Sequence, residues 1–306
     1  MTEATATAMR GVWNDPVWLS GLAGGAAAAA LIAWATGGLP LAPVAFWLVP
    51  LPLLLAGLGF GLPAAVIGAG AGALLLLLLS SITALTLYGL VFAVPVLVAL
   101  VTGASGPAFA LARPMALLGL WPAALVLVAA VLLADHPGGL DGALREAVTG
   151  ALRQMGAPTD PATVDLIVQV KAGALAFWFA VSLAGSAALA QRFLAGRGLN
   201  RLPSVAWASA RLPGWYPPLA AVAIAGWLVS EDSTILSSVA LALGVPLLLQ
   251  GLAAIHERSR AFAGRRFLLA GVYAVLILFS IPAAVLLAGF GVFDQYGRRA
   301  APPGQT

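Results

Sequence analysis

Long apolar runs, separated by glycine, proline or short charged segments, make up most of this chain. Each run is continuously apolar, whereas the strands of a membrane barrel alternate between apolar and polar residues. A backbone in lipid must satisfy its own hydrogen bonds, and about 20 apolar residues cross a bilayer as a helix. The pattern predicts nine spans, with eight as the alternative: Val17–Thr36, Leu41–Ala56, Leu62–Leu79, Ile82–Val101, Ala116–Ala134, Val164–Ala190, Pro217–Ser230, Thr234–Ile255 and Phe267–Phe293.

Two of these spans are weakly indicated. Leu41–Ala56 is short and contains three prolines, so we expect it to be kinked or partly re-entrant. Pro217–Ser230 would extend over only about 21 Å at 1.5 Å per residue, and it needs Trp215 and Tyr216 as interfacial anchors to cross the membrane.

The segment LDGALREAVTGALRQMGA, residues 140–157, lies between the fifth and sixth spans and has a different pattern. Its apolar residues recur at helical spacing, while its charged residues fall elsewhere. We expect a short amphipathic helix at the outer membrane interface, with a lid over a ligand site as the alternative. The chain is then a single integral membrane domain with an N-terminal helical half (1–134), an extra-membrane amphipathic segment (135–163) and a C-terminal helical half (164–306).

Composition strengthens this interpretation. Hydrophobic residues make up 61% of the 306 residues and charged residues only 8%, whereas a soluble domain carries roughly 25% charged residues. No Asp, Glu, Lys or Arg occurs between Asp15 and Arg113, a stretch long enough for several spans. The predicted fold class is all-α: a polytopic transmembrane helical bundle surrounded by the lipid bilayer.

The few charges predict an orientation. Arginines lie beside apolar segments, as they do in cytoplasmic loops, so the net charge of +4 indicates a membrane surface and no nucleic acid. We expect a multi-pass protein of the bacterial cytoplasmic (inner) membrane with a cytoplasmic N-terminus. Nine spans then place Arg298 and Arg299 outside, against the positive-inside rule. The arginines assigned to the cytoplasm are Arg10, Arg113, Arg192, Arg197, Arg201, Arg211, Arg258, Arg260, Arg265 and Arg266, and the acidic outer connections are 135–165 and 230–233.

The pair His256-Glu257 resembles the start of a zinc-protease motif. That motif needs a second histidine at position 260, which is an arginine, and His136 is predicted on the opposite side of the membrane. The chain also has no cysteine. We therefore interpret His256 and Glu257 as the polar end of a helix leaving the lipid, and we expect no metal, no cofactor and no enzymatic activity.

Polar side chains inside spans are candidates for a ligand site, because burying them in lipid costs free energy. Gln169 and Lys171 lie near the outer end of a span, where Lys171 either extends to the interface or holds an anionic ligand at the mouth of a cavity. Gln250 lies deeper and either bridges helices or contacts a ligand, with bridging favoured. Further candidates for lining a cavity are Ser182, Ser186, Tyr88 and Tyr273.

Small residues recur at intervals of four in two predicted helices. Gly21, Gly25 and Ala29 do so in the first span, and Gly68 and Gly72 in the third. This spacing lets helix backbones approach closely, which is how helices associate in lipid. We expect these five residues at helix interfaces.

Four stretches together carry a family resemblance: FWLVPLPLLLAGLGFGLPAAV from Phe46, ARLPGWYPPL from Ala210, LLLQGLAAIH from Leu247 and GFGVFDQYGRR from Gly289. In this order they resemble the YybS-like family of uncharacterised bacterial integral membrane proteins, over nearly the whole chain. The family has no assigned activity and so implies no catalytic residues. Its N-terminal half is similar to the substrate-binding subunits of energy-coupling-factor vitamin transporters, which implies a six-helix core with a ligand cavity and a small-residue face on the first helix.

Two function hypotheses follow. The first is a non-catalytic subunit that binds or transports a small molecule with an energising partner, because the chain has no nucleotide-binding loop of its own. The second is a scaffolding membrane protein that holds partner proteins or anionic lipid head groups through its Gly/Ala helix faces and cytoplasmic arginine loops.

Overall fold

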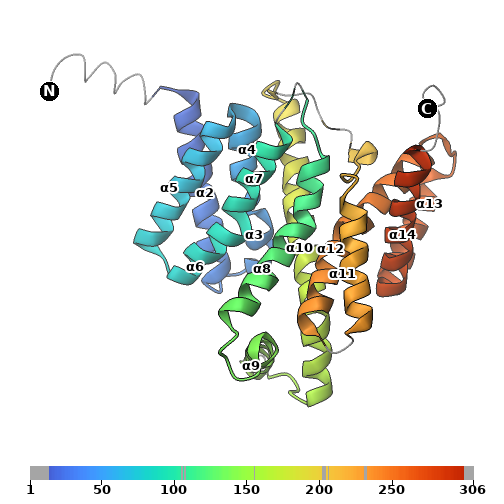
Figure 1. Ribbon diagram of the computed structural model, residues 1–306. Helices are drawn as coiled ribbons and strands as arrows, with labels where there is room; N and C mark the ends of the chain where they lie inside the picture. Colours follow the sequence, from blue (N-terminus) through green and yellow to red (C-terminus); the bar gives the residue numbers. More distant parts are fainter. Residues whose placement is uncertain are drawn as a thin grey trace. The chain divides into compact units, whose positions relative to one another are not determined.

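The computed structural model describes residues 14–104, 106, 108–154, 156–201, 205, 207–230 and 233–299. All regular elements in these residues are helices, which confirms the predicted all-α class (Figure 1). Seven helical segments are long and apolar enough to cross a membrane, which indicates a multi-pass membrane protein. They are Pro16–Thr36, Ala42–Phe60, Leu62–Leu79, Ile82–Gly103, Ala112–Leu132, Ala174–Ala195 and Thr234–Ala261.

The described residues form two compact units, and the first contains the N-terminal helices. Its main contact joins α2 to α5, and α4 packs against both. Asp15 fixes the start of α2, because its carboxylate accepts a hydrogen bond from the Val17 amide at 2.8 Å. The elements of this unit are α2 (Pro16–Thr36), α3 (Ala42–Leu48), α4 (Pro50–Phe60), α5 (Leu62–Leu79), α6 (Ile82–Leu87), the π-helix η1 (Tyr88–Ala93), α7 (Val94–Gly103) and, from residue 181, the end of α10 (Pro161–Ala195).

The glycines singled out in the sequence lie where α2 meets α5. A β-carbon at Gly68 would lie 2.9 Å from the Gly21 carbonyl oxygen, and one at Gly72 would lie 3.0 Å from the Gly25 carbonyl oxygen. A β-carbon at Gly25 would meet the backbone of Gly68. Ala29, one turn further along α2, is buried. The two backbones approach so closely that a side chain at these glycines would force them apart.

The second unit is organised around α12, whose apolar segment is more buried than that of any other candidate span. Helix α12 packs against α8, α11 and α14. The unit differs from the predicted C-terminal half, because it includes α8 and excludes the end of α10. Its elements are α8 (Ala112–Leu132), α9 (Gly139–Gln154), residues 161–180 of α10, the 3-10 helices η2 (Trp207–Ser209) and η3 (Ser259–Ala261), α11 (Tyr216–Val229), α12 (Thr234–Arg258), α13 (Arg265–Leu278) and α14 (Ser280–Arg299).

The weakly indicated spans are helical but differ in length from the prediction. The segment predicted as Leu41–Ala56 is helical from Ala42 to Phe60, and Val49, between α3 and α4, also has helical dihedral angles. Helix α11 has 14 residues and remains shorter than the seven candidate spans. The apolar part of α10 that can cross a membrane starts at Ala174, so residues 161–173 precede it.

Helix α9 packs on this preceding part of α10. Val148 and Leu152 of α9 form a buried cluster with Val164 and Val168 of α10. The apolar residues of α9, which the sequence pattern predicts at a membrane surface, therefore also pack against α10. Together α9 and residues 161–173 make a helical hairpin with a small core of its own, and the position of α9 at the outer interface stays a prediction.

Polar contacts attach α9 to its neighbours. Arg145 donates a hydrogen bond to Asp141 at 2.8 Å and forms an ion pair with Asp165 of α10. Thr234, at the start of α12, donates to the second oxygen of Asp141 at 3.0 Å. The hydrogen bond from Arg145 is the main cause that lowers the pKa of Asp141, so this carboxylate is ionised at neutral pH.

The predicted last span, Phe267–Phe293, is two helices, so the expectation of one continuous span is wrong. Helix α13 ends at Leu278, Phe279 adopts φ −116° and ψ 24°, and α14 follows directly. In a continuous helix the Leu278 carbonyl would accept a hydrogen bond from residue 282, but Pro282 has no N–H to donate. The proline thus accounts for the break.

Helices α13 and α14 form a hairpin that returns the chain to the end of α12. Arg258, the last residue of α12, donates to Asp294 near the end of α14 at 2.9 Å. Because α13 starts just after α12, it leaves this end and α14 comes back to it. Helix α14 closes with Arg298 and Arg299, whose side chains lie outside the described residues. The hairpin places this terminus beside the other arginines and removes the conflict with the positive-inside rule.

Gly25→Ala is expected to destabilise the first unit, because the added methyl group meets the Gly68 backbone. Overpacking of this kind costs about 1–3 kcal/mol. Gly70→Ala in α5 is the matched control, since no atom lies within 4 Å of the β-carbon position there. The control should be neutral or stabilised by up to about 1 kcal/mol, because alanine favours helix over glycine. Thermal unfolding in detergent measures both, and equal midpoints would contradict the close contact.

Single cysteines in this cysteine-free chain are expected to report the hairpin. Ala263→Cys before α13 and Gly297→Cys in α14, both exposed, should react with a membrane-impermeant maleimide from the same side of sealed vesicles. Ala147→Cys on α9 should react from the opposite side, because α9 contacts the start of the 25-residue helix α12, about 37 Å from its end. Labelling of positions 297 and 147 from one side would rule out the hairpin topology.

Candidate functional site

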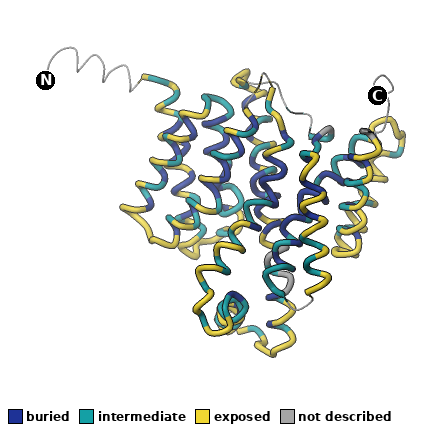
Figure 2. The backbone as a smooth tube through the Cα atoms, viewed as in Figure 1, coloured by how far each residue is buried: buried dark blue, intermediate teal, exposed yellow. Residues whose placement is uncertain are grey.

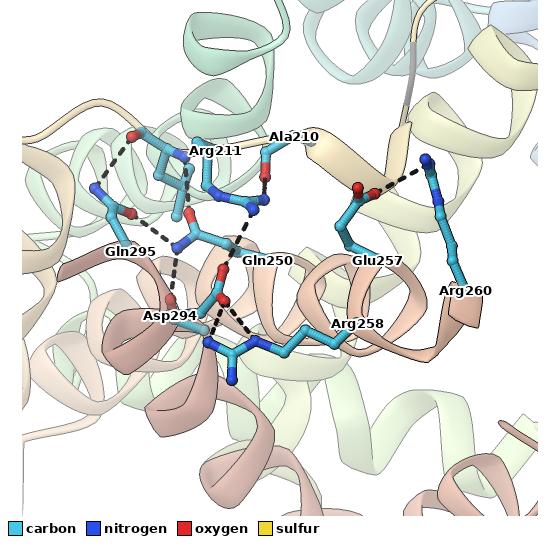
Figure 3. Close-up of polar contacts among 10 residues, drawn as sticks. Ala210, Arg211, Gln250, Glu257, Arg258, Arg260, Asp294 and Gln295 are labelled. Carbon is cyan, nitrogen blue, oxygen red and sulfur yellow. Dashed lines mark hydrogen bonds and ion pairs between the residues drawn. The ribbon is translucent and has the colours of Figure 1, made fainter. Parts of the chain in front are cut away.

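A buried carboxylate lies where three segments of the second unit meet (Figure 3). Asp294 of α14 is 0% exposed. Arg258 of α12 places Nη2 at 2.7 Å from Oδ1, and Arg211, in the loop before α11, places Nη2 at 3.3 Å from Oδ2. Each carboxylate oxygen faces a guanidinium group, and this attraction offsets the cost of removing the charge from water.

Two buried glutamines hold the neighbouring backbone. The Gln250 side-chain oxygen accepts from the Leu212 amide at 2.7 Å, and its nitrogen donates to the Gly291 carbonyl at 2.7 Å and to Gln295 at 2.8 Å. Gln295 donates in turn to the Leu212 carbonyl at 3.2 Å. Both backbone polar groups of Leu212 are thereby satisfied although the segment is a loop. This pairing holds the adjacent Arg211 against the carboxylate.

We call Arg211, Gln250, Arg258, Asp294 and Gln295 the Asp294 cluster. Its geometry depends on a close approach of α12 and α14. A β-carbon at Gly291 would lie 2.7 Å from the Gly251 amide nitrogen, and one at Gly251 would meet the Leu287 carbonyl oxygen. Because neither position has room for a side chain, the helices come near enough for Gln250 to reach the backbone of α14.

Further polar contacts surround the cluster at the same end of α12. Glu257 pairs with Arg260 at 3.0 Å. His256 Nε2 lies 3.0 Å from the Tyr273 hydroxyl, which ties α12 to α13. The Arg258 guanidinium lies 5.2 Å from the centre of the Phe290 ring. These contacts hold the exposed end of the second unit together.

The Asp294 cluster is suited to joining segments of chain. Its carboxylate is engaged by two guanidinium groups, arginine does not lose its proton in proteins, and glutamine does not ionise. Within the described part of the chain, no three His, Asp or Glu side chains are placed to hold a metal ion together. The side chains of the Asp294 cluster can therefore bridge segments of the chain and attract opposite charges nearby.

The structure separates the predicted ligand residues. Gln250 lies at the centre of the Asp294 cluster, and its hydrogen bonds go to Leu212, Gly291 and Gln295, which is a bridging role. Lys171 is half-buried in α10, and the side chain of Gln169 lies outside the described residues. A cavity shared by Gln169, Lys171 and Gln250 stays a prediction.

Sequence reasoning missed the role of Asp294, Gln295 and Arg211. Their signal was present but weak: Asp294 and Gln295 follow an apolar run directly, four residues before Arg298. A carboxylate at the end of a predicted span needs a cationic partner. The partner could not be identified, because several arginines were assigned to the same side.

The first unit contains two prolines in the helical segment Ala42–Phe60, where α3 meets α4. Pro50 and Pro52 have no N–H, so the regular hydrogen-bond pattern fails there. Ser182 and Ser186 of α10 donate to the Trp47 carbonyl at 2.8 and 3.4 Å. Side chains of a neighbouring helix thus bond to the backbone beside the prolines, while Val49 keeps helical dihedral angles, φ −52° and ψ −41°.

The π-helix η1 is a second irregular feature of this unit. It ends two residues before Pro95, and the Tyr88 hydroxyl of η1 donates to the Gly68 carbonyl at 3.3 Å. Phe92 of η1 contacts Phe46 of α3 edge to face, with ring centres 4.9 Å apart. The aromatic pair therefore joins η1 to the proline-containing segment.

No protein-family model, curated protein or solved structure matches this chain.

Asp294→Asn is expected to destabilise the second unit by about 2 kcal/mol, because hydrogen bonds to charged groups contribute about 1.5–3 kcal/mol and two arginines lose their counter-charge. Glu257→Gln removes a pair whose arginine is exposed and should cost less than about 1 kcal/mol. Chemical unfolding followed by tryptophan fluorescence in detergent compares the two variants. Similar losses of stability in both variants would show that the Asp294 cluster stabilises the protein no more than the Glu257–Arg260 pair does.

Proposed function

We propose that this protein is a non-catalytic membrane subunit that binds or transports a small molecule and is energised by a partner protein. The observation that carries the proposal is the contact between Phe46, beside the prolines of the segment Ala42–Phe60, and Phe92 of the π-helix η1. Prolines and π-helical turns within a span leave backbone groups that neighbouring protein or a ligand must satisfy. π-Helical turns are frequent at functional sites.

The chemistry of this region fits a ligand with both polar and apolar parts. Pro50 and Pro52 cannot donate to the Phe46 and Leu48 carbonyls, so these oxygens are hydrogen-bond acceptors for a ligand, and the partly buried Phe46 and Trp47 offer aromatic surface. The resemblance proposed from the sequence, to a family similar in its N-terminal half to the substrate-binding subunits of energy-coupling-factor transporters, would place the ligand in the same region. A separate energising partner is required because the chain has no phosphate-binding loop.

We also propose an orientation in the bacterial inner membrane. The arginine-rich end of the second unit, with Arg211, Arg258 and Arg265, faces the cytoplasm, and α9 faces the outside. The predicted cytoplasmic N-terminus belongs to the same proposal and lies outside the described residues, as does Arg10.

Native mass spectrometry of the full chain purified in mild detergent tests this function. We expect a bound non-lipid metabolite of defined mass. Phe92→Leu should reduce its occupancy, because it removes the aromatic contact that joins η1 to Phe46 beside the proposed site. Phe267→Leu on the exposed surface of α13 is the control and should retain the metabolite.

Two results would contradict the proposal. One is a purified protein that carries only lipids, even after expression in rich medium. The other is equal occupancy of the metabolite in Phe92→Leu and Phe267→Leu, because a site beside Phe46 and Phe92 must lose metabolite when Phe92 is replaced. The scaffolding hypothesis would then account better for the protein.

A further inference from the structure

The cytoplasmic end of the second unit has more positive charge than its own carboxylates neutralise. In the segments that meet at the end of α12, the described arginines Arg211, Arg258, Arg260, Arg265 and Arg266 outnumber the carboxylates of Asp294 and Glu257 by three, and Arg113 at the start of α8 adds to the positive charge predicted for this side. Both carboxylates are already engaged by Arg211, Arg258 and Arg260.

Arg265 and Arg266 carry the uncompensated charge. They are the first two residues of α13 and are exposed, and neither forms an ion pair with any described residue. The His256–Tyr273 hydrogen bond ties α13 to the end of α12, and the two arginines lie in the chain between these two residues.

Apolar surface begins immediately after these two arginines. Phe267 is 86% exposed, and α13 has no buried residue along its length (Figure 2). Exposed apolar residues on a membrane helix face lipid chains, whereas arginines at the helix start lie at the level of the head groups. The boundary between Arg266 and Phe267 thus matches the boundary between the phosphate and the acyl chains of a phospholipid.

We propose that Arg265 and Arg266 bind the phosphate of an anionic phospholipid whose acyl chains lie along α13. A guanidinium group donates two parallel hydrogen bonds to a phosphate, which suits arginine to this contact. A free phosphate ion meets the same charges but makes no use of the apolar surface from Phe267 onward. This surface favours a lipid as the source of the phosphate.

The test uses delipidated full-length protein in detergent and native mass spectrometry with added phosphatidylglycerol or phosphatidylcholine of identical acyl chains. The wild type should bind phosphatidylglycerol more tightly, and salt should weaken this preference. One basic residue near an anionic membrane surface changes binding about fivefold, so R265Q and R266Q should each lose about that factor and the double variant about thirtyfold. Arg153→Gln, at an exposed site on α9, is the matched control and should bind as the wild type does.

Each remaining outcome overturns the proposal. Unchanged phosphatidylglycerol binding in the double variant, or equal binding of phosphatidylcholine, removes the role of the two arginines. Inorganic phosphate that protects the wild type from thermal unfolding as well as the lipid does, through the same arginines, identifies a free anion as the ligand. Loss of a copurified protein with lipid binding intact identifies a protein-docking surface.

Discussion

The burial of Asp294 is the constraint on which the second unit depends. A carboxylate removed from water costs several kcal/mol unless opposite charges and hydrogen bonds surround it. Here the compensation comes from Arg211 and Arg258, which belong to different segments, so the carboxylate is tolerated only when the loop before α11, α12 and α14 are all in place. The charge makes correct assembly of these segments a condition of stability.

This constraint also orders the rest of the unit. Because α14 must return to Arg258, the chain between them has to reverse, and Pro282 places the reversal at Phe279. The reversal gathers the arginines at one end and leaves α13 at the periphery with no buried residue. Packing in the first unit follows another principle, since the glycines of α2 and α5 bring two backbones together without any buried charge.

Most helices could be predicted because a helix that lies in lipid consists of a continuous run of apolar residues. The spacing of small residues around Gly25 and around Gly68 likewise indicated close helix packing. It did not indicate which helices pack together. The last hairpin escaped detection, since an apolar run gives the same pattern for one helix as for two short ones. The Asp294 cluster escaped for a related reason: Leu212 and Gln295 are 83 residues apart, and local periodicity contains no information on such pairings.

The shortness of α11 and α13 has a consequence for the surrounding membrane. Each has 14 residues and extends over about 21 Å, whereas the hydrocarbon core of a bilayer is about 30 Å thick. Both are shorter than the seven helical segments that are long enough to cross a membrane. In the proposed orientation, lipids beside α11 and α13 would compress or tilt to avoid hydrophobic mismatch, which would favour thin, easily deformed regions of membrane.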